Sequence, residues 1–363
     1  MKVLRVINSL KMGGAERSIE TNVPKHIKNG IETDVLLLSG EITPFYESLV
    51  SQGVKVFVTS KWSIYNPLNI IKIIPYIRKY DIIHVHLFPA LYWVCFAKLL
   101  SFAKTPLIYT EHSTNNRRRN SFFFKPIDRF VYRQYKHIIS ISDATTKNLV
   151  DYIGSTHRIS TIYNGVDLIP YTLKYDRLEF FPDSDKTHVI TQIASFRYPK
   201  DQKTTIRALK FLDDSVHAVF VGAGDEISSC KNLAEEIGVK ERVHFLNNRT
   251  DIPAIVASSD IIVMSSIYEG FGRAAVEGMA GKKPVVASNV PGLCDVVKGA
   301  GLLFEAQNEG DLANCICQLL GSNSFYEEVA NRCYLRSKDY DVHNMIEGYE
   351  TIYYQVVKKR RSK

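Results

Sequence analysis

The chain has 363 residues, of which 45% are hydrophobic and 23% are charged. This is the composition of a globular protein, and it excludes collagen-like, coiled-coil and disordered chains; the length suits two domains of ~150–180 residues each. The longest apolar stretch, residues 87–97, is shorter than the ~20 residues that a membrane-spanning helix needs. The N-terminal apolar run is too short for a signal peptide and predicts a first buried strand.

The formal net charge of +8 is concentrated in two segments, 115–137 and 358–363, and the rest of the chain is slightly acidic. Localised basic patches suit contact with an anionic surface, so we expect no nucleic-acid partner. The six cysteines are scattered, and none forms a Cys-x-x-Cys pair. This spacing predicts neither a disulfide framework nor a metal site, and it favours a reducing, cytoplasmic location.

In chain order, the first half alternates β-branched runs with longer amphipathic segments. The helical segments include 15–29 and 89–103, and strands are predicted at 3–8, 34–38, 54–58, 82–86, 107–110 and 138–142. This alternation is typical of a parallel sheet covered by helices. Residues 167–186 then break the pattern, because they are charged, contain two prolines and show no periodicity, which predicts a linker.

The same alternation restarts after the linker. Helices are predicted at 202–212, 273–281 and 311–319, and strands at 189–194, 218–221, 243–246, 261–264 and 284–287. We therefore expect two doubly wound α/β domains, residues 1–168 and 183–344, with a final helix at 345–363 that packs back on the first domain. Ligands of such sheets bind beyond the carboxyl ends of the strands.

Two loops combine glycine or cations with a strand end. Gly13 and Gly14 precede the first helix, where their N–H groups could approach a phosphate, although a simple tight turn has the same composition. Arg197 follows strand 189–194, and Lys203 lies in the first helical turn behind the N-cap residue Asp201. The helix dipole opposes a cation there unless an anion binds. The two cations could neutralise a diphosphate without a metal, or they could simply be solvated.

A third segment follows strand 261–264 and reads Glu269-Gly270-Phe271-Gly272-Arg273, with Glu277 in the next helix. Its glycines allow close backbone approach where the helix begins, and the free N–H groups there suit a phosphate. Carboxylates on either side suit sugar hydroxyls. The alternative is that Glu269 is an ordinary surface acid and Glu277 an exposed helix acid.

These motifs resemble those of the retaining glycosyltransferases of family 4. Glu269-x7-Glu277 encloses Phe271-Gly272 and is preceded by Arg197-x5-Lys203. Further matches follow in order along nearly the whole chain: Gly-Gly-Ala-Glu at 13–16, Thr-Glu-His at 110–112, Ser-Ile-Ser-Asp at 140–143, Asn-Gly-Val-Asp at 164–167 and Val-Gly-Ala-Gly at 221–224. The resemblance implies the GT-B fold, in which two Rossmann-like domains face a central cleft, the first binding the acceptor and the second the nucleotide-sugar donor.

The resemblance also implies roles for individual residues. Arg197 and Lys203 would hold the diphosphate and stabilise it as it leaves. Glu277 would bind ribose, Glu269 the donor sugar, and His112 would lie near the anomeric carbon. The donor contacts would be completed by Gly13, Gly14 and the backbone of Gly270, Phe271, Gly272 and Arg273. Such enzymes use a UDP- or GDP-linked donor, retain the anomeric configuration and need no metal or other cofactor.

Several features bear on how far the resemblance extends. The loop Val290-Pro291-Gly292 stands where relatives often have Gly-Gly, which leaves the donor sugar open. The Gly-Ala-Gly at 222–224 lacks the third glycine of a nicotinamide fingerprint. The acid pair at 183–185 is interpreted as part of the linker and not as a metal site. His84 and His86 face the same side of a strand, which suits hydrogen-bonded structural histidines better than acceptor contacts.

A basic aromatic patch belongs to the first domain. Its members are Arg117, Arg118, Arg119, Phe122, Phe123, Phe124, Lys125, Arg129, Tyr132, Arg133 and Lys136. Arginines with exposed aromatic residues suit an anionic membrane, and the tail 358–363 would add to the attraction. The alternative is that the phenylalanines are core residues and the arginines are solvated.

The sequence therefore predicts a cytoplasmic glycosyltransferase, peripheral on the inner face of the membrane, that extends a lipid-linked glycan in surface polysaccharide biosynthesis. A sugar-nucleotide epimerase on the same fold is the first alternative, and a non-catalytic module that binds nucleotide sugars or membranes is the second. Nucleotide release that depends on an acceptor separates the glycosyltransferase from both alternatives.

Overall fold

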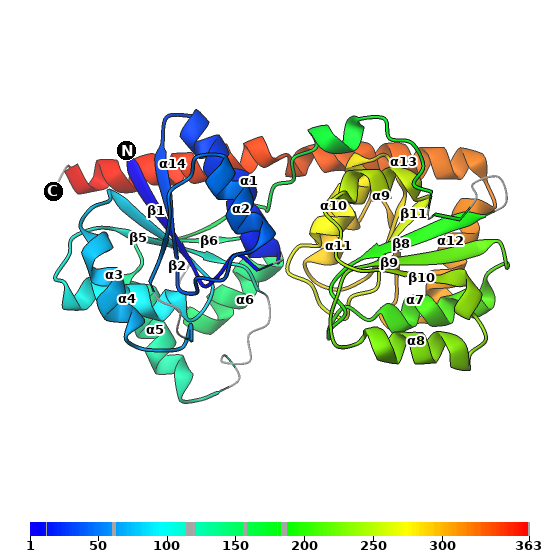
Figure 1. Cartoon of the computed structure of the whole chain (residues 1–363), viewed down its shortest axis with the longest axis horizontal. Coiled ribbons are helices and arrows are strands. Elements are labelled where there is room, and N and C mark those ends of the chain that lie inside the picture. Colours follow the sequence, from blue (N-terminus) through cyan, green and yellow to red (C-terminus); the bar gives the residue numbers. More distant parts are fainter. Residues whose placement is uncertain are drawn as a thin grey trace. The chain divides into compact units, whose positions relative to one another are not determined.

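The computed structural model describes residues 1–11, 13–59, 63–113, 119, 121–154, 158–179, 181–182 and 187–361, with the last side chain described at Lys358. The chain forms two compact units (Figure 1). Unit 1 comprises Met1–Gly165 and Val342–Lys363, and unit 2 comprises Val166–Asp341. The predicted acid pair at 183–185, Arg117 and Arg118 lie outside the described residues, as do the side chains of 359–363.

Unit 1 is built on a seven-stranded parallel sheet with the strand order β3-β2-β1-β4-β5-β6-β7. Its strands are β1 (Lys2–Ile7), β2 (Glu32–Leu37), β3 (Val56–Val58), β4 (Ile82–His86), β5 (Leu107–Glu111), β6 (His137–Ser140) and β7 (Ile159–Thr161). Its helices are α1 (Gly14–Lys28), α2 (Pro44–Ser51), α3 (Asn69–Ile77), α4 (Ala90–Leu100), α5 (Phe124–Gln134), α6 (Asp143–Ile153) and α14 (Val342–Arg361). The register places Val3 of β1 between Thr33 of β2 and Ile82 of β4.

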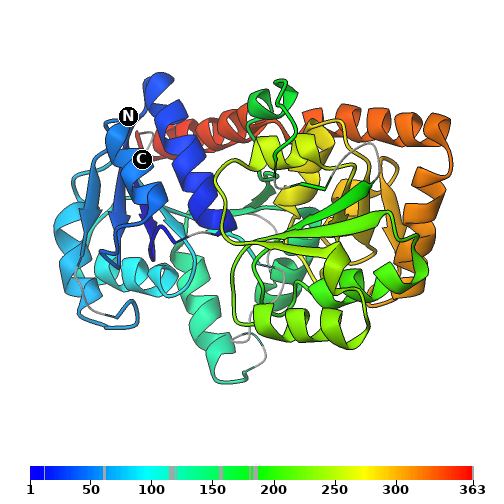
Figure 2. The same cartoon turned by 45° about the vertical axis from the view of Figure 1, so that its right-hand side comes forward.

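Helices cover both faces of this sheet because alternate strand residues point to opposite sides. Leu4 and Val6 of β1 pack with α3, α4, α5 and α6. On the other face, Val3 packs with α14 and Ile7 packs with α1 and α2. Both ribbon views show α14 running along the sheet beside α1 (Figures 1 and 2). Arg5 lies on this second face, between Val3 and Ile7.

Unit 2 is built on a six-stranded parallel sheet with the order β10-β9-β8-β11-β12-β13. Its strands are β8 (His188–Ile193), β9 (Val216–Val221), β10 (Val243–Leu246), β11 (Ile261–Met264), β12 (Val285–Ser288) and β13 (Leu302–Phe304). Its helices are α7 (Gln202–Ala208), α8 (Ile227–Glu236), α9 (Ile252–Ser258), α10 (Arg273–Ala280), α11 (Leu293–Val297), α12 (Glu309–Leu320) and α13 (Asn323–Ser337). Short 3-10 turns are η2 (Ile169–Thr172), η3 (Leu209–Phe211), η4 (Lys240–Arg242) and η5 (Lys338–Tyr340).

In each sheet the first strand is central, the next two lie on one side of it and the later strands on the other. This order defines a doubly wound α/β sheet, so the predicted fold class is confirmed. The strand order reverses between β1 and β4 in unit 1 and between β8 and β11 in unit 2. Ligands of doubly wound sheets bind at these switch points.

The segment predicted as a linker is instead attached to unit 2. The guanidinium group of Arg177 donates hydrogen bonds to the carbonyls of Pro182 and Ser258, and the backbone N–H of Leu178 donates to the Ser258 hydroxyl at 3.1 Å. Phe181 is buried. The charged, aperiodic composition concealed these contacts, because they are made by single side chains and not by a regular element.

Candidate functional site

The two loops predicted to bind the donor follow adjacent strands of the unit 2 sheet. β8 leads into the loop that carries Arg197, and β11 leads into the loop that carries Glu269. β8 and β11 are paired, with Ile190 opposite Ile261 and Thr191 opposite Ile262. Their shared carboxyl edge is the switch point of the sheet. The fold thus brings two segments that are distant in sequence to the edge where such sheets bind ligands.

Glu269 is not an ordinary surface acid. Its carboxylate forms an ion pair with the ammonium group of Lys200, and the side chains of Lys200 and Glu269 are only 20% and 16% exposed. The carboxylate also accepts hydrogen bonds from the backbone N–H of Gly270 at 3.2 Å and from the Ser266 hydroxyl at 3.4 Å. Lys200 is absent from the predicted site residues. Its only sequence signal is a third cation in the loop that carries Arg197.

The start of α10 presents backbone rather than side chains. Gly272 has a φ of +86°, and a Cβ atom there would lie 2.5 Å from Cδ1 of Leu293, so a glycine is required. The Phe271 ring is buried and packs edge-on against Tyr340, with ring centroids 5.3 Å apart. The Gly-Phe-Gly segment can therefore offer an anion only its backbone N–H groups, at the start of the helix.

Glu277 of α10 is buried, with a side chain only 7% exposed, and one of its oxygens accepts a hydrogen bond from Nε of Arg273 at 2.9 Å. The alternative of an exposed helix acid is therefore wrong. The loop at 290–292 lies against the Glu269 segment, because a Cβ atom on Gly292 would come within 2.4 Å of the Glu269 carbonyl oxygen. The structure thus places the loop that departs from the family pattern beside a predicted sugar contact.

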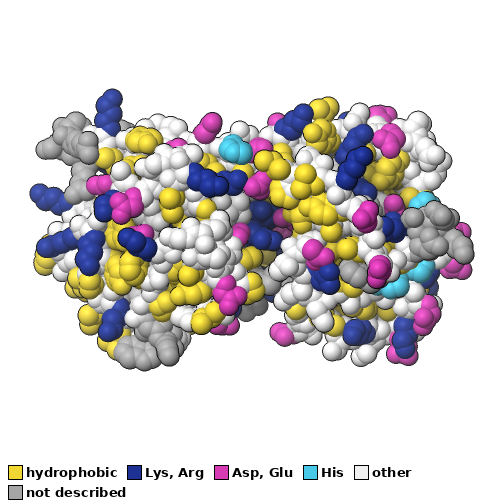
Figure 3. All heavy atoms as spheres, turned by 45° about the horizontal axis from the view of Figure 1, so that its top comes forward, with side chains coloured by type: hydrophobic (Ala, Val, Ile, Leu, Met, Phe, Trp, Pro, Cys, Tyr) yellow, Lys and Arg dark blue, Asp and Glu magenta, His cyan; other side chains and the backbone are white. Residues whose placement is uncertain are grey.

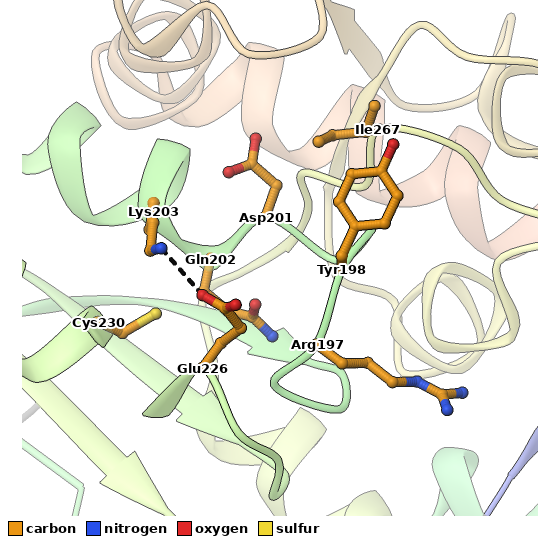
Figure 4. Close-up of a pocket in the computed structure, with 8 residues that line it drawn as sticks. All are labelled: Arg197, Tyr198, Asp201, Gln202, Lys203, Glu226, Cys230 and Ile267. Carbon is orange, nitrogen blue, oxygen red and sulfur yellow. Dashed lines mark hydrogen bonds and ion pairs between the residues drawn. The ribbon is translucent and has the colours of Figure 1, made fainter. Parts of the chain in front are cut away.

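Arg197 and Lys203 line one pocket of about 170 Å³, together with Tyr198, Asp201, Gln202, Glu226, Cys230 and Ile267 (Figure 4). Lys203 points toward Glu226, and their Nζ and Oε2 atoms are 2.9 Å apart. Arg197 extends away from this pair and is exposed. Hydrogen bonds from Lys203 and Ser229 lower the pKa of Glu226. The pocket therefore contains an acid, Glu226, that the motifs did not predict.

Two features shape the loop that carries Arg197. Asp201 occupies the N-cap position of α7, but its φ of +49° is left-handed instead of extended, and its carboxylate accepts a hydrogen bond from the Thr204 hydroxyl at 2.7 Å. Asp201 is therefore the N-cap residue, as predicted, but without the extended backbone of an ordinary N-cap. Gly224 has a φ of +151°, and a Cβ atom there would lie 2.2 Å from the Phe196 carbonyl oxygen. The Gly-Ala-Gly segment thus serves close packing against this loop.

In unit 1, the predicted glycines begin α1. Gly13 is the N-cap residue, with an extended backbone at φ −161°, and Gly14 is the first helical residue. The helix that follows has 15 residues, and Glu16 lies in its first turn. The glycines therefore lie at the N-terminus of a long helix, beside the carboxyl end of β1. The free N–H groups at this position are compatible with a phosphate contact.

The Thr-Glu-His motif ends β5, and each of its residues binds a different partner. The Thr110 hydroxyl lies 2.7 Å from Nε2 of His84, and Nε2 of His112 lies 2.9 Å from Nδ1 of His86. Burial, together with the positive charge of Arg5, lowers the pKa of His112 to about 3. His112 is therefore neutral at physiological pH. His84 and His86 are fully buried and hydrogen-bonded.

Glu111, the central residue of that motif, binds two residues predicted to lie in the basic aromatic patch. A guanidinium nitrogen of Arg119 lies 2.5 Å from Oε2 of Glu111, and the Tyr132 hydroxyl donates to the same oxygen at 2.7 Å. The side chains of Arg119 and Glu111 are 6% and 4% exposed. The assignment of Arg119 and Tyr132 to the exposed patch is therefore wrong, because both neutralise a buried carboxylate.

The rest of the described patch lies on the surface. Phe122 and Phe123 are 86% and 81% exposed, and Ile127 and Phe130 are about half exposed. Lys125, Arg129 and Arg133 of α5 are also exposed, each four residues from the next. These phenylalanines are therefore not core residues. α5 presents an apolar stripe beside a basic row, and in Figure 1 it lies at the periphery of unit 1.

Comparison with known families gives the class that this fold and site define. Residues 12–169 match the family model described as Glycosyltransferase Family 4, and residues 176–336 match the model described as Glycosyl transferases group 1. The protein is a glycosyltransferase with the GT-B fold. The two models follow each other along the chain, so its membership of the family 4 glycosyltransferases, expected from the motifs, is confirmed.

Individual relatives span large parts of the chain. The N-acetyl-alpha-D-glucosaminyl L-malate synthase of Bacillus anthracis is 25% identical over 77% of this chain and 75% of its own length. The N,N'-diacetylbacillosaminyl-diphospho-undecaprenol alpha-1,3-N-acetylgalactosaminyltransferase of Campylobacter jejuni is 30% identical over 48% of this chain and 46% of its own. The crystal structure of Anabaena HepE in complex with UDP and glucose matches the fold with a TM-score of 0.85 at 24% identity, covering 97% of this chain and 99% of that one.

Two surface properties bear on partners. Over the part of the chain that the structure describes, no helix has both the length and the apolar character required to cross a membrane. On the face shown in Figure 3, the Lys and Arg side chains of unit 1 are scattered among acidic and apolar ones.

Proposed function

We propose that the protein is a retaining, metal-independent glycosyltransferase that transfers a sugar from a UDP- or GDP-linked donor to a lipid-linked glycan. The observation that carries the proposal is the switch point of unit 2. Arg197, Lys200 and Lys203 follow β8 there, and the amide end of α10 follows β11. Cations and helix N–H groups in this arrangement suit a diphosphate, and the UDP in the HepE crystal structure supports such a donor.

In the proposed reaction, the bond between the anomeric carbon and the diphosphate oxygen breaks. A bond forms on the same face between that carbon and the acceptor hydroxyl oxygen, and the acceptor proton passes to the departing phosphate. Negative charge grows on the diphosphate during this step. Cations and N–H groups already in place stabilise that charge, and removal of one such donor typically lowers the rate by ~10²–10³.

The other site residues are proposed to orient the donor. Glu269 and Glu277 accept hydrogen bonds from sugar and ribose hydroxyls, and their burial in ion pairs with Lys200 and Arg273 supports fixed positions for both. His112 lies near the anomeric carbon. Gly13 and Gly14 contribute N–H groups to the distal phosphate.

Acceptor-dependent nucleotide release tests this proposal. The purified protein is incubated with UDP- and GDP-sugars, with and without lipid extracts that contain diphosphate-linked glycans, and free UDP or GDP is measured. Release that requires the acceptor supports the transferase. Conversion of the donor sugar without acceptor would identify an epimerase, and binding without turnover would identify a non-catalytic module. The anomeric coupling constant of the product tests retention, and full activity in excess chelator tests metal independence.

We also propose that α5 docks unit 1 on the anionic cytoplasmic face of a membrane, where a lipid-linked acceptor would be presented. Basic residues near such a surface each contribute ~1 kcal/mol, and exposed aromatic side chains insert at the interface. The C. jejuni relative, whose name states a diphospho-undecaprenol acceptor, supports this choice. The B. anthracis relative, whose name states L-malate, represents the soluble-acceptor alternative.

Sedimentation with anionic liposomes tests the docking. Phe122→Ser/Phe123→Ser should reduce the pelleted fraction. Phe102→Ser is the matched control, because Phe102 is also highly exposed, at 89%. It precedes β5 at the amino end of that strand, whereas Phe122 and Phe123 lie in the loop that follows its carboxyl end. An equal loss in the control, or no pelleting of the natural protein at low salt, would contradict docking through α5.

A further inference from the structure

Unit 1 contains a buried cation that the motifs did not reveal. Arg5 of β1 is only 1% exposed. No ion pair joins it to an acid among the described residues; instead, its guanidinium group lies 5.0 Å from the ring centroid of Tyr349 and 5.6 Å from that of Tyr353, both on α14. A buried charge is costly unless other groups solvate it. Cation–π contacts and the imidazole nitrogens around Arg5 take that role.

Three histidines accept hydrogen bonds from Arg5. Its guanidinium nitrogens lie 3.0 Å from Nε2 of His26, 2.8 Å from Nδ1 of His84 and 3.0 Å from Nε2 of His86. A guanidinium group only donates, so each of these nitrogens must be unprotonated. Each ring is neutral and carries its single proton on the other nitrogen. Burial, together with the charge of Arg5, lowers the pKa of all three histidines.

The remaining proton of each ring is therefore placed as well. Nδ1–H of His86 donates to Nε2 of His112 at 2.9 Å, Nε2–H of His84 donates to the Thr110 hydroxyl at 2.7 Å, and Nδ1–H of His26 donates to Glu350 at 3.1 Å. Because Nε2 of His112 accepts a hydrogen bond, its own proton must reside on Nδ1. The direction of every bond in this relay follows from the fixed donor character of Arg5.

We propose that Arg5 is a positioning residue for glycosyl transfer: acting through His86, it holds His112 as the neutral Nδ1–H tautomer, so that His112 offers a hydrogen-bond donor to the donor sugar. This inference rests on the proposed function, in which His112 lies near the anomeric carbon. It also assigns α14 a part in the reaction, because Tyr349 and Tyr353 solvate the cation that sets the relay. His112 then acts as a hydrogen-bond donor and not as a general acid or base.

Among the residues that the structure describes, the titratable groups around Arg5 belong to neighbouring elements of unit 1. These groups are His26 from α1, His84 and His86 from β4, His112 after β5, and Tyr349, Glu350 and Tyr353 from α14. Burial raises the pKa of both tyrosines, so neither ionises near neutral pH. Replacement of Arg5 by an apolar side chain removes the positive charge that suppresses protonation of the histidines. The pKa values of the histidines should then rise, while burial, the larger cause, continues to hold them below the usual value.

Nitrogen-15 NMR of the histidine rings tests the tautomer in the natural protein without measuring activity. His112 should show a protonated Nδ1 and an unprotonated Nε2, with its signals assigned by their loss in His112→Gln. A protonated Nε2 would overturn the inference. If the tautomer is as stated but the protein transfers no sugar, the relay stands and the proposed function fails, so the two outcomes are distinguishable.

Kinetics test the link to the reaction. Arg5→Met should lower kcat about 10–100-fold and leave the donor KM near its natural value. The magnitude is that seen when a metal-binding histidine loses the hydrogen-bond partner that orients it. The kcat profile should gain an acidic limb, below pH ~6.5 but above the pH at which the natural protein titrates, because only the Arg5 share of the suppression is lost. Arg5→Lys, which keeps charge and donors, should restore part of kcat and remove the limb. Ile346→Ala controls for lost packing, because Ile346 of α14 is buried on the same face. An unchanged pH profile in Arg5→Met would overturn the proposal.

Discussion

Replacement of Lys203 by alanine separates a cation that binds the donor from one that only pairs with Glu226. The side chains of Lys203 and Glu226 are 36% and 44% exposed, so loss of the pair should cost no more than ~1 kcal/mol of stability. For a chain of this size, that corresponds to a fall in Tm of no more than about 4 °C. If Lys203 stabilises the departing diphosphate, kcat should fall by ~10²–10³, which corresponds to ~2.7–4 kcal/mol. The expected variant is folded and slow.

The assay compares initial rates of acceptor-dependent nucleotide release with thermal melting on the same samples. Glu226→Gln is the matched control, since it breaks the same ion pair but keeps the cation. It should retain activity close to that of the natural protein. Equal, small losses in both variants, or normal turnover by Lys203→Ala, would refute the diphosphate role of Lys203.

Lys200→Ala should also lower kcat by ~10²–10³ and should raise the donor KM, because it leaves the carboxylate of Glu269 without its cation beside a diphosphate; unchanged steady-state kinetics would argue against this. Arg119→Leu should lower the free energy of unfolding in urea by ~3–5 kcal/mol by stranding buried Glu111, and a loss below 1 kcal/mol would contradict the buried ion pair. The four histidines near Arg5 have pKa values below the usual one, that of His112 at about 3. The unfolded chain therefore binds more protons as pH falls below ~6.5, and stability should decrease from there by up to ~1.4 kcal/mol per pH unit for each histidine. Urea titrations at pH 7.5 and 5.5 with equal midpoints would disprove this.

Most of the fold is predictable because its strands are short runs rich in β-branched and other apolar residues. Strands β4, β10 and β11 begin and end at the predicted residues. The runs of β10 and β11 are bounded on both sides by charged or polar residues, and that of β4 is preceded by Asp81. The missed strands β7 and β13 have three residues each, too few to show a pattern. Helix α13 is one of several helices that the sequence analysis does not name, and its apolar residues are spread around it without forming one stripe.

The candidate site was predictable only where residues are close in sequence. The Glu269 and Glu277 motif lies within one loop and helix, so its spacing carries the signal. The ion pair of Lys200 with Glu269 joins positions 69 apart, and the contact of His84 with Tyr353 joins positions 269 apart. From the sequence alone, an arginine in a strand such as Arg5 resembles a solvent-exposed residue of an edge strand. Its burial becomes apparent only when the neighbouring strands and helices are known. Its charge gives no sign of the histidines that will surround it.

Helix α14 has a consequence for biosynthesis. The residues of unit 2 are contiguous in the chain, so this part can complete its fold during translation. Unit 1 requires Val342 and the residues after it, which leave the ribosome after unit 2, to cover β1, β4 and β5. Until then, an apolar sheet face with a charged arginine in its middle stays open to water. Premature termination shortly before α14 would therefore spare unit 2 and leave unit 1 unfinished.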